Sequence, residues 1–164
     1  MKSDKKDKSE KKEKREKRDR EAVAGGEDGH DESDVKRARV SVIANPLASK
    51  KLTKSLLKLI QKASAAKLVR RGVKEVVKAL KKDEKGLCII AGDISPIDVI
   101  CHIPIYCEEK VVPYIYVPSK EDLGSASQTK RPTSIVMVKA GSDVELKSLL
   151  DECVGEVRQA TPKF

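Results

Sequence analysis

The segment RRGVKEVVK, residues 70–78, contains the side chains best suited to bind an anion. Its charged residues are Arg70, Arg71, Lys74, Glu75 and Lys78. If a helix begins after Gly72, the two lysines and the glutamate share one exposed sector opposite a valine-rich side. The arginines then come directly before the helix N-terminus, where unsatisfied N–H groups attract phosphate. Gly72 would let a phosphate backbone approach without a side chain in the way.

Glu75 is the unexpected member of this basic segment, because a carboxylate repels phosphate. It is explained if it accepts hydrogen bonds from base amino or imino groups. The alternative is a routine solvated helix face, on which Glu75 and Lys78 form a weak i,i+3 ion pair. From these nine residues alone, both interpretations stay open.

The preceding stretch is rich in lysine and free of acid. Between Asp34 and Glu75 there are twelve Lys and Arg and no Asp or Glu. On a helix over residues 49–66 the lysines fall in one sector, opposite the apolar residues. They are Lys50, Lys51, Lys54, Lys58 and Lys62. Like charges at i,i+4 destabilise a helix, so a polyanion partner explains the lysines better than stability does. We expect Lys50, Lys54 and Lys58 to extend the RNA contact of residues 70–78.

Apolar periodicity predicts an α/β domain, with helices and strands that alternate along the chain. Helices are expected at 49–66, 73–80, 96–110 with a bend or a restart at Pro104, 120–124, and after a capping box of Ser142 and Glu145. Strands are expected at 87–91, 114–117 and 134–138. Short, continuously apolar strands imply a sheet covered on both faces. The predicted fold is a three-layer α/β/α sandwich with a small mixed sheet.

Composition divides the chain into two parts. Residues 1–39 hold 14 basic and 12 acidic residues, which predicts a disordered charged tail that could carry a nuclear address. Residues 40–160 form the expected domain, and no run is apolar enough to span a membrane. Few aromatic residues are present to stack on single-stranded bases. The four cysteines show no metal spacing and are expected to be small buried hydrophobes in an intracellular, soluble protein.

Asp93 and Asp98 raise the possibility of an α/β enzyme, because they follow a predicted strand. No phosphate-binding loop, dinucleotide fingerprint, nucleophile elbow or metal-ligand spacing accompanies them. Asp93 is more simply explained as the cap of a turn or helix before Pro96. The sequence therefore predicts a non-catalytic protein without a cofactor or metal.

Three blocks of sequence resemble the kink-turn-binding ribosomal protein family. They are RRGVKEVVK, AGDISPIDVICHIPIYCEEKVVPYIYVPSKEDLG and KRPTSIVMV, and the resemblance runs from about Val42 to Val157. Within the family the chain looks most like the Nhp2-type subunits of eukaryotic H/ACA ribonucleoproteins. The resemblance implies an α/β/α fold that binds structured RNA at one edge.

The resemblance also implies roles for single residues. Lys74, Glu75 and Lys78 would read the sheared G·A pairs of a kink, with Arg70, Arg71 and Gly72 near phosphates. Two loops would complete the site: residues 94–99, where Val99 lines an apolar pocket for an extruded base, and residues 117–120, which include Pro118 and Ser119. Strict kink-turn readers carry Asn in place of Lys74 and other residues in place of Pro118. Because Lys only donates hydrogen bonds, we expect weaker discrimination among folded RNAs.

For function, the resemblance implies a subunit of H/ACA particles that supports rRNA pseudouridylation and ribosome biogenesis, with telomerase RNA and snRNA particles as further settings. The implied partners are H/ACA guide RNA, a dyskerin-type pseudouridine synthase and the Nop10-type and Gar1-type subunits. A monomer within a larger particle in the nucleus and nucleolus is expected. The alternative is a strict kink-turn binder of box C/D, spliceosomal or ribosomal type.

Overall fold

The computed structural model describes residues 40–141 and 143–161. The charged tail and nuclear address predicted over residues 1–39 lie outside the described residues. In chain order the elements are α3 (Lys50–Ala65), β1 (Val69–Arg71), α4 (Val73–Lys81), β2 (Gly86–Ala91), the 3₁₀ turn η1 (Ile97–Val99), α5 (Ile103–Glu109), β3 (Tyr114–Val117), α6 (Lys120–Ala126), β4 (Ile135–Lys139) and α7 (Val144–Ala160). The described helices include none that is long and apolar enough to cross a membrane.

The four strands form one mixed sheet in the order β1-β4-β2-β3. Strand β4 is antiparallel to both β1 and β2, whereas β2 and β3 are parallel. Strands β1, β2 and β3 therefore run in the same direction, and their C-terminal ends meet at one end of the sheet. Loops that follow these strands are brought together there, which decides where the candidate site lies.

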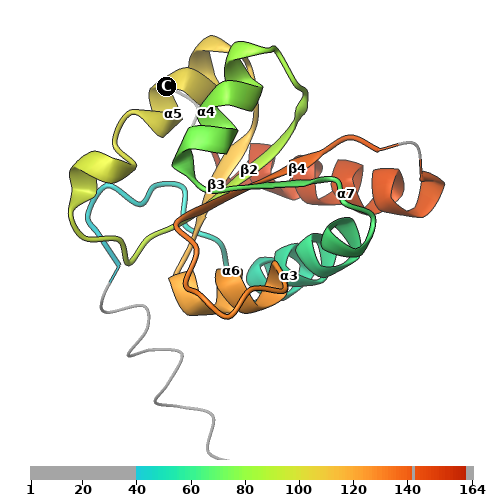
Figure 1. The fold of residues 1–164 in the computed structure, drawn as a ribbon, viewed down its shortest axis with the longest axis horizontal. Coiled ribbons are helices and arrows are strands. Elements are labelled where there is room, and N and C mark those ends of the chain that lie inside the picture. The colour runs from blue at the N-terminus through green and yellow to red at the C-terminus, as the bar shows by residue number, and fades with distance from the viewer. Residues whose placement is uncertain (1–39, 142, 162–164) are drawn as a thin grey trace, which may run out of the picture. The chain divides into compact units, whose positions relative to one another are not determined.

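Two apolar clusters lie on opposite faces of the sheet. One joins α3, α6 and α7 to alternate strand residues such as Ile89 and Val136. The other joins α4 and α5 to the intervening residues, such as Ile90 and Met137. Because successive strand residues point to opposite faces, each strand contributes to both clusters. Figure 1 shows α4 and α5 on one side of the sheet and α3 and α6 on the other, which confirms the predicted three-layer α/β/α fold.

Local signals explain where the helices begin. Helix α3 is capped by Ser49, whose Oγ accepts a hydrogen bond from the Leu52 amide at 3.2 Å. Helix α6 is capped in the same way by Ser119, whose Oγ accepts from the Asp122 amide at 3.3 Å. Pro104 lies in the first turn of α5, so of the two alternatives predicted for the 96–110 segment, a bend or a restart, the structure shows the restart.

Three local features differ from those that the sequence predicted. The strand β1 was not expected: it has only three residues, too few for an apolar pattern. The capping box was expected at Ser142, which lies outside the described residues, but the N-cap of α7 is Asp143, which makes no side-chain cap hydrogen bond. Of the four free cysteines, Cys101 is exposed although all were expected to be buried. The buried Cys153 fits the expectation, and burial raises the pKa of its thiol to about 11.

Candidate nucleic-acid interface

The three predicted contact segments meet at the end of the sheet where β1, β2 and β3 finish. Backbone hydrogen bonds link them: the Gly72 amide donates to Ile135 O at 3.0 Å, and the Gly92 amide donates to Val117 O at 2.8 Å. Between these, the Ala91 amide donates to Ser134 O at 2.8 Å. The start of α4, the loop over residues 92–99 and the loop after β3 are therefore neighbours, although up to 47 residues separate them in the sequence.

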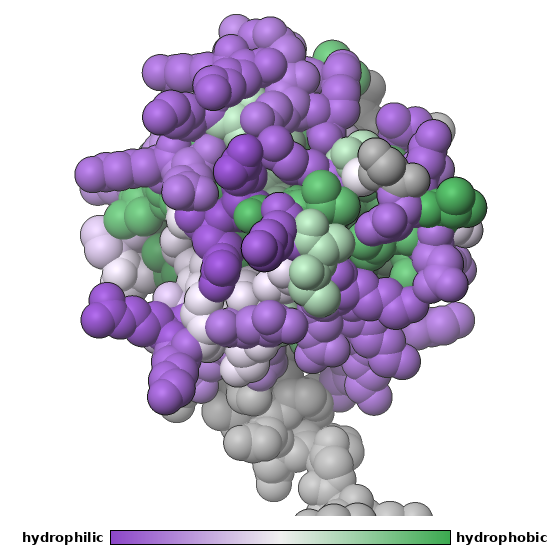
Figure 2. Space-filling view, turned by 45° about the vertical axis from the view of Figure 1, so that its right-hand side comes forward, coloured by the Kyte–Doolittle hydropathy of each residue, from purple (hydrophilic) through white to green (hydrophobic). Residues whose placement is uncertain are grey.

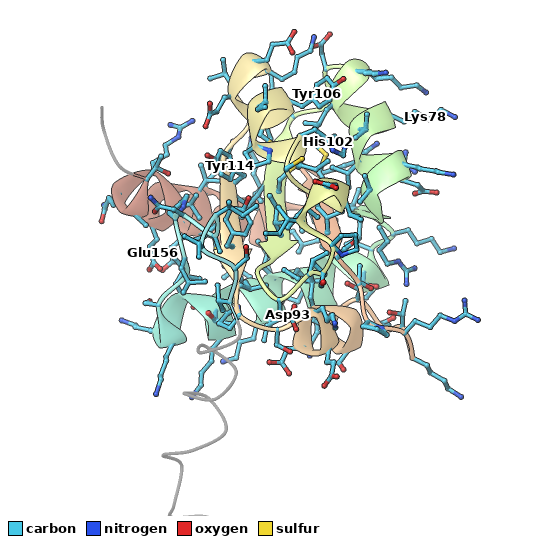
Figure 3. The ribbon with its side chains drawn as sticks, turned by 90° about the vertical axis from the view of Figure 1, so that its left-hand side faces the viewer. Lys78, Asp93, His102, Tyr106, Tyr114 and Glu156 are labelled. Carbon is cyan, nitrogen blue, oxygen red and sulfur yellow. The ribbon has the colours of Figure 1, made fainter. Side chains whose placement is uncertain are left out.

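An open cavity of about 330 Å³ lies along α4 and contains most of the predicted charged residues. Its lining residues are Arg70, Lys74, Glu75, Lys78, Ala79, Lys82 and Glu84. The two lysines of the predicted sector, Lys74 and Lys78, are exposed, as is Glu75. Figure 3 shows the Lys78 side chain extending outward from α4. A hollow lined by four cations and two carboxylates suits a ligand that carries both phosphates and hydrogen-bond donors.

The expected i,i+3 ion pair between Glu75 and Lys78 is not formed within the described part of the chain. Intramolecular pairing therefore does not explain why these two side chains share a face. The ion pair of the alternative is absent, but the exposed side chains fit a solvated helix face as well as an RNA contact, so both interpretations stay open.

Gly72 connects β1 to α4 in a backbone conformation that favours glycine, with φ at +86°. A Cβ added there would meet nothing within 4 Å, so the space outside the backbone is open. No side chain caps the helix, and the first-turn amides of α4 have no side-chain partner at the N-cap. Both features agree with the predicted approach of a phosphate backbone.

The two arginines were expected to act together, but the structure separates them. They lie on β1, and adjacent strand residues point to opposite faces. The Arg70 Nε atom lies 3.7 Å from Glu84 Oε2 and the residue lines the α4 cavity. Arg71 instead donates from its guanidinium to the Ser127 carbonyl at 3.0 Å, which ties β1 to the end of α6. Of the pair, Arg70 is the one that lines the cavity.

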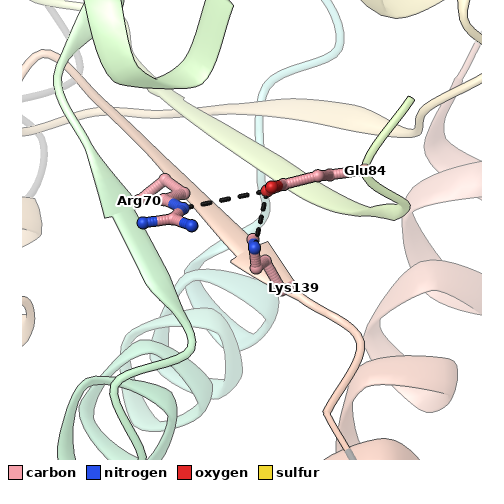
Figure 4. A network of polar contacts seen from close by, with 3 residues as sticks. All are labelled: Arg70, Glu84 and Lys139. Atoms are coloured by element: carbon pink, nitrogen blue, oxygen red, sulfur yellow. Dashed lines mark ion pairs between the residues drawn. The ribbon is translucent and has the colours of Figure 1, made fainter. Parts of the chain in front are cut away.

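A three-residue ionic network borders the cavity (Figure 4). Glu84 Oε2 lies 2.7 Å from Lys139 Nζ and 3.7 Å from Arg70 Nε. The hydrogen bond from Lys139 lowers the pKa of the Glu84 carboxyl, and the charges of Lys139 and Arg70 add to this effect. The network connects β1 and β4 to the turn before β2, and it holds the Arg70 side chain beside α4.

Replacement of Glu84 by Gln should change how stability depends on pH. A folded-state pKa below the ordinary value of 4.5 stabilises the folded protein above that value, and this contribution is lost as the pH falls through the folded pKa. The wild type should therefore exceed Glu84→Gln in urea midpoint near pH 7, and the difference should shrink toward pH 3. The control is Glu145→Gln, an exposed carboxylate on α7. An equal wild-type advantage at both pH values would contradict the prediction.

The loop after β2 presents apolar side chains to solvent. Val99 and Ile97 of η1 are about 40% exposed, so Val99 is accessible as the predicted pocket residue requires. In the loop after β3, Pro118 is half-buried and Ser119 is buried with its hydroxyl engaged in capping α6. Any RNA contact at Ser119 would therefore involve its backbone. The contact roles of Val99, Pro118 and Ser119 stay predictions.

Asp93 joins these two loops. Its Oδ1 accepts a hydrogen bond from the Lys120 amide at 2.9 Å, which corrects the expectation that it caps its own turn before Pro96. The described residues contain no group of three or more His, Cys, Asp or Glu side chains placed to hold a metal ion. Asp93, one of the two carboxylates that raised the enzyme hypothesis, has a structural role through its hydrogen bond to the Lys120 amide.

Replacement of Asp93 by Ala should loosen the Lys120 amide. Loss of the acceptor leaves this amide without its partner, at a cost of about 1 kcal/mol for a half-buried group. Hydrogen exchange at Lys120 should then accelerate about fivefold, while the central amides of β2 keep their rates. Asp93→Asn keeps a carbonyl acceptor and is the matched control. Equal exchange rates in the Ala and Asn variants would exclude this role.

The lysines of α3 are not part of the assembled site. Lys50, Lys54 and Lys58 are exposed, but α3 packs on the face of the sheet opposite α4. The α3 lysines and residues 70–78 therefore do not form one continuous surface, and an RNA contact by Lys50, Lys54 and Lys58 stays a prediction. A ligand seated at α4 reaches α3 only by passing around the sheet.

Further charged residues lie at or near the candidate site and were not predicted from the sequence. Lys82 and Glu84 line the α4 cavity from the turn that follows the helix. Lys130 and Arg131 are exposed on the connection between α6 and β4, which leads to the end of the sheet where β1, β2 and β3 finish. The only available signal was their charge in the segment KRPT, directly before an apolar strand.

Comparisons with known proteins are consistent with this arrangement. Residues 54–147 match the model of the ribosomal protein L7Ae/L30e/S12e/Gadd45 family, a region that holds all the predicted site residues except Lys50. The chain belongs to this family. The resemblance of the three sequence blocks is thereby confirmed.

Named relatives extend the match. An H/ACA ribonucleoprotein complex subunit 2-like protein of Arabidopsis thaliana is 56% identical over 119 residues, 69% of this chain and 76% of its own. The H/ACA ribonucleoprotein complex subunit 2 of Bos taurus is 51% identical over 120 residues, 73% of this chain and 77% of its own. Among solved structures, a Giardia lamblia 15.5kD RNA binding protein is similar with a TM-score of 0.71 and 31% identity, covering 74% of this chain and all of its own.

Proposed function

We propose that the protein is a non-catalytic RNA-binding subunit of H/ACA ribonucleoprotein particles. The observation that carries the proposal is the identity of about half the residues with plant and animal proteins named H/ACA ribonucleoprotein complex subunit 2, across about three quarters of their length. The α4 cavity supports it from the geometry, because it brings cations and an exposed carboxylate together along α4. The protein would support rRNA pseudouridylation and ribosome biogenesis by binding RNA.

We propose that RNA contacts come from Arg70, Gly72, Lys74, Glu75 and Lys78, with Val99 and Pro118 on the neighbouring loops. Lysines donate hydrogen bonds and act as point charges, so phosphate should supply most of the affinity. Lys74 is the residue that sets the protein apart from strict kink-turn readers. Specific placement would then depend on a dyskerin-type synthase with Nop10-type and Gar1-type subunits, in the nucleolus.

The test is co-purification of the tagged full-length protein from cells, followed by sequencing of the associated RNA. Enrichment of H/ACA guide RNAs with a dyskerin-type synthase supports the proposal. Enrichment of box C/D RNA, or a preference of the isolated protein for a kink-turn over a matched duplex by orders of magnitude, would support the strict kink-turn alternative instead. A Lys74→Asn variant should prefer the kink-turn over the matched duplex more strongly than the wild type does.

A further inference from the structure

Helix α3 carries a lysine strip that the proposed α4 site does not use. The strip consists of Lys50, Lys51, Lys54, Lys58 and Lys62, all exposed. Helix α3 contains no Asp or Glu, and its buried side is formed by leucine, isoleucine and alanine. From Lys50 to Lys62 the helix rises about 18 Å. One strand of a duplex presents about five phosphates over that length.

The strip and the α4 cavity face away from each other across the sheet. The buried side of α3 belongs to the apolar cluster on one face, and that of α4 belongs to the cluster on the other. Each helical layer is roughly 10–12 Å thick. In Figure 1 the sheet lies between α3 and α4. A phosphate bound near Lys74 or Lys78 therefore cannot also contact the strip.

Other elements neutralise the strip only in part. Helix α7 packs against α3, and its Glu152 and Glu156 line a small cleft of about 100 Å³ together with Lys58. No other strip residue lines that cleft. Within the described residues, Lys51, Lys54, Lys58 and Lys62 form no ion pair. Figure 2 shows that hydrophilic side chains cover much of one face of the molecule, so a hydrophilic surface alone does not mark a site. The lysine strip differs from the rest of the surface because all the charged side chains along α3 are positive.

The energetics of the helix point to an external partner. Lysines at i,i+4 repel each other, and a solvated helix relieves this with acids at the same spacing. Helix α3 has none, so its own stability does not explain the pattern. A regular row of point charges without base-reading carboxylates or aromatics fits a sugar–phosphate backbone, bound without regard to sequence.

We propose that the α3 lysine strip is a second RNA-backbone contact, which holds a stretch of RNA distinct from the one at the α4 cavity. The protein would thereby fix two segments of one guide RNA on opposite faces of the sheet. This inference rests on the proposed function, because it takes the ligand to be an H/ACA guide RNA. It adds a second contact between the protein and the same RNA molecule.

The test compares two RNAs and two variants of the full-length protein. One RNA is a single H/ACA hairpin and the other is a complete two-hairpin guide. The strip variant is Lys51→Gln/Lys54→Gln/Lys62→Gln, because glutamine removes charge and keeps helix propensity. The matched control is Lys85→Gln/Lys147→Gln/Arg158→Gln, which removes three exposed charges elsewhere. Circular dichroism and thermal unfolding verify that both variants fold.

The strip variant should bind the complete guide about tenfold more weakly than the control, and its log–log salt slope should be lower by about two. Binding of the single hairpin should change by less than twofold. Crosslinks from the strip lysines and from Lys74 and Lys78 should map to different nucleotides of the guide.

Three outcomes would overturn the proposal. They are equal losses in the strip variant and the control, crosslinks from both surfaces to the same nucleotides, and unchanged RNA affinity with loss of a protein partner. The last would identify the strip as a surface for an acidic protein. Failure of the proposed function looks different: alanine variants of Lys74 and Lys78 would then leave the binding of both RNAs unchanged.

Discussion

A protein with Lys74 and Lys78 both replaced by alanine should bind an H/ACA hairpin about 30- to 100-fold more weakly than the wild type. Both side chains are exposed and line the open cavity along α4. Each is expected to neutralise one phosphate, so the log–log dependence of affinity on salt should also lose about 1.5 in slope. Filter binding or anisotropy over a range of salt concentrations measures both quantities.

The matched control is Lys85→Ala with Lys147→Ala, which removes the same charge from exposed positions outside the cavity. This control should weaken binding less than threefold. If the two double variants behave alike, net charge alone explains the affinity and α4 is not the contact. A wild-type affinity that does not depend on salt would contradict the phosphate-binding mechanism directly.

Replacement of Gly124 by Ala should lower the free energy of unfolding by about 3 kcal/mol. We expect no larger loss of stability from a methyl group added to a helix of this protein. A Cβ at this position in α6 would clash with the Arg131 carbonyl oxygen. That oxygen belongs to the backbone and also accepts a hydrogen bond from Thr129 Oγ1 at 3.0 Å. The chain would have to separate α6 from the connection that carries Lys130 and Arg131.

A glycine-to-alanine substitution in α7 is the control, and it should change the free energy of unfolding in the opposite direction. Gly155 lies within α7, and a Cβ added there meets nothing within 4 Å. Gly155→Ala should therefore stabilise the protein by about 0.5–1 kcal/mol, because alanine favours the helix. Urea unfolding of the three proteins measures both effects. If Gly124→Ala lowers the free energy of unfolding by less than 1 kcal/mol, the connection between α6 and β4 moves to accommodate the methyl group at little cost, which would contradict the prediction.

Apolar periodicity predicted most of the secondary structure because the helices are long and one-sided. The five apolar residues expected on one face of α3, Leu52 to Ala63, are the buried ones. Strands β2 and β3 were predicted because all but their first residues are buried, which leaves continuous apolar runs. Strand β1 was missed since two of its three residues are exposed arginines, and its pairing with β4 is a long-range contact.

The site was predictable where it depends on residues close in sequence. Lys74, Glu75 and Lys78 share a face of α4 because of helical spacing, and the structure places all three in one cavity. Their relation to α3 depends instead on which side of the sheet each helix packs, which no local pattern specifies. For the same reason the sequence could not show that Arg70 pairs with Glu84 while Arg71 turns toward Ser127.

Three hydrogen bonds have a consequence for the energetics of binding: the Lys120 amide to Asp93, the Gly72 amide to Ile135 O, and the Gly92 amide to Val117 O. Loops that are already joined lose little conformational entropy when a ligand arrives, so the interface is pre-organised. Association should then resemble the docking of two rigid bodies, with a fast, salt-steered on-rate. Differences among RNAs would appear chiefly as differences in residence time.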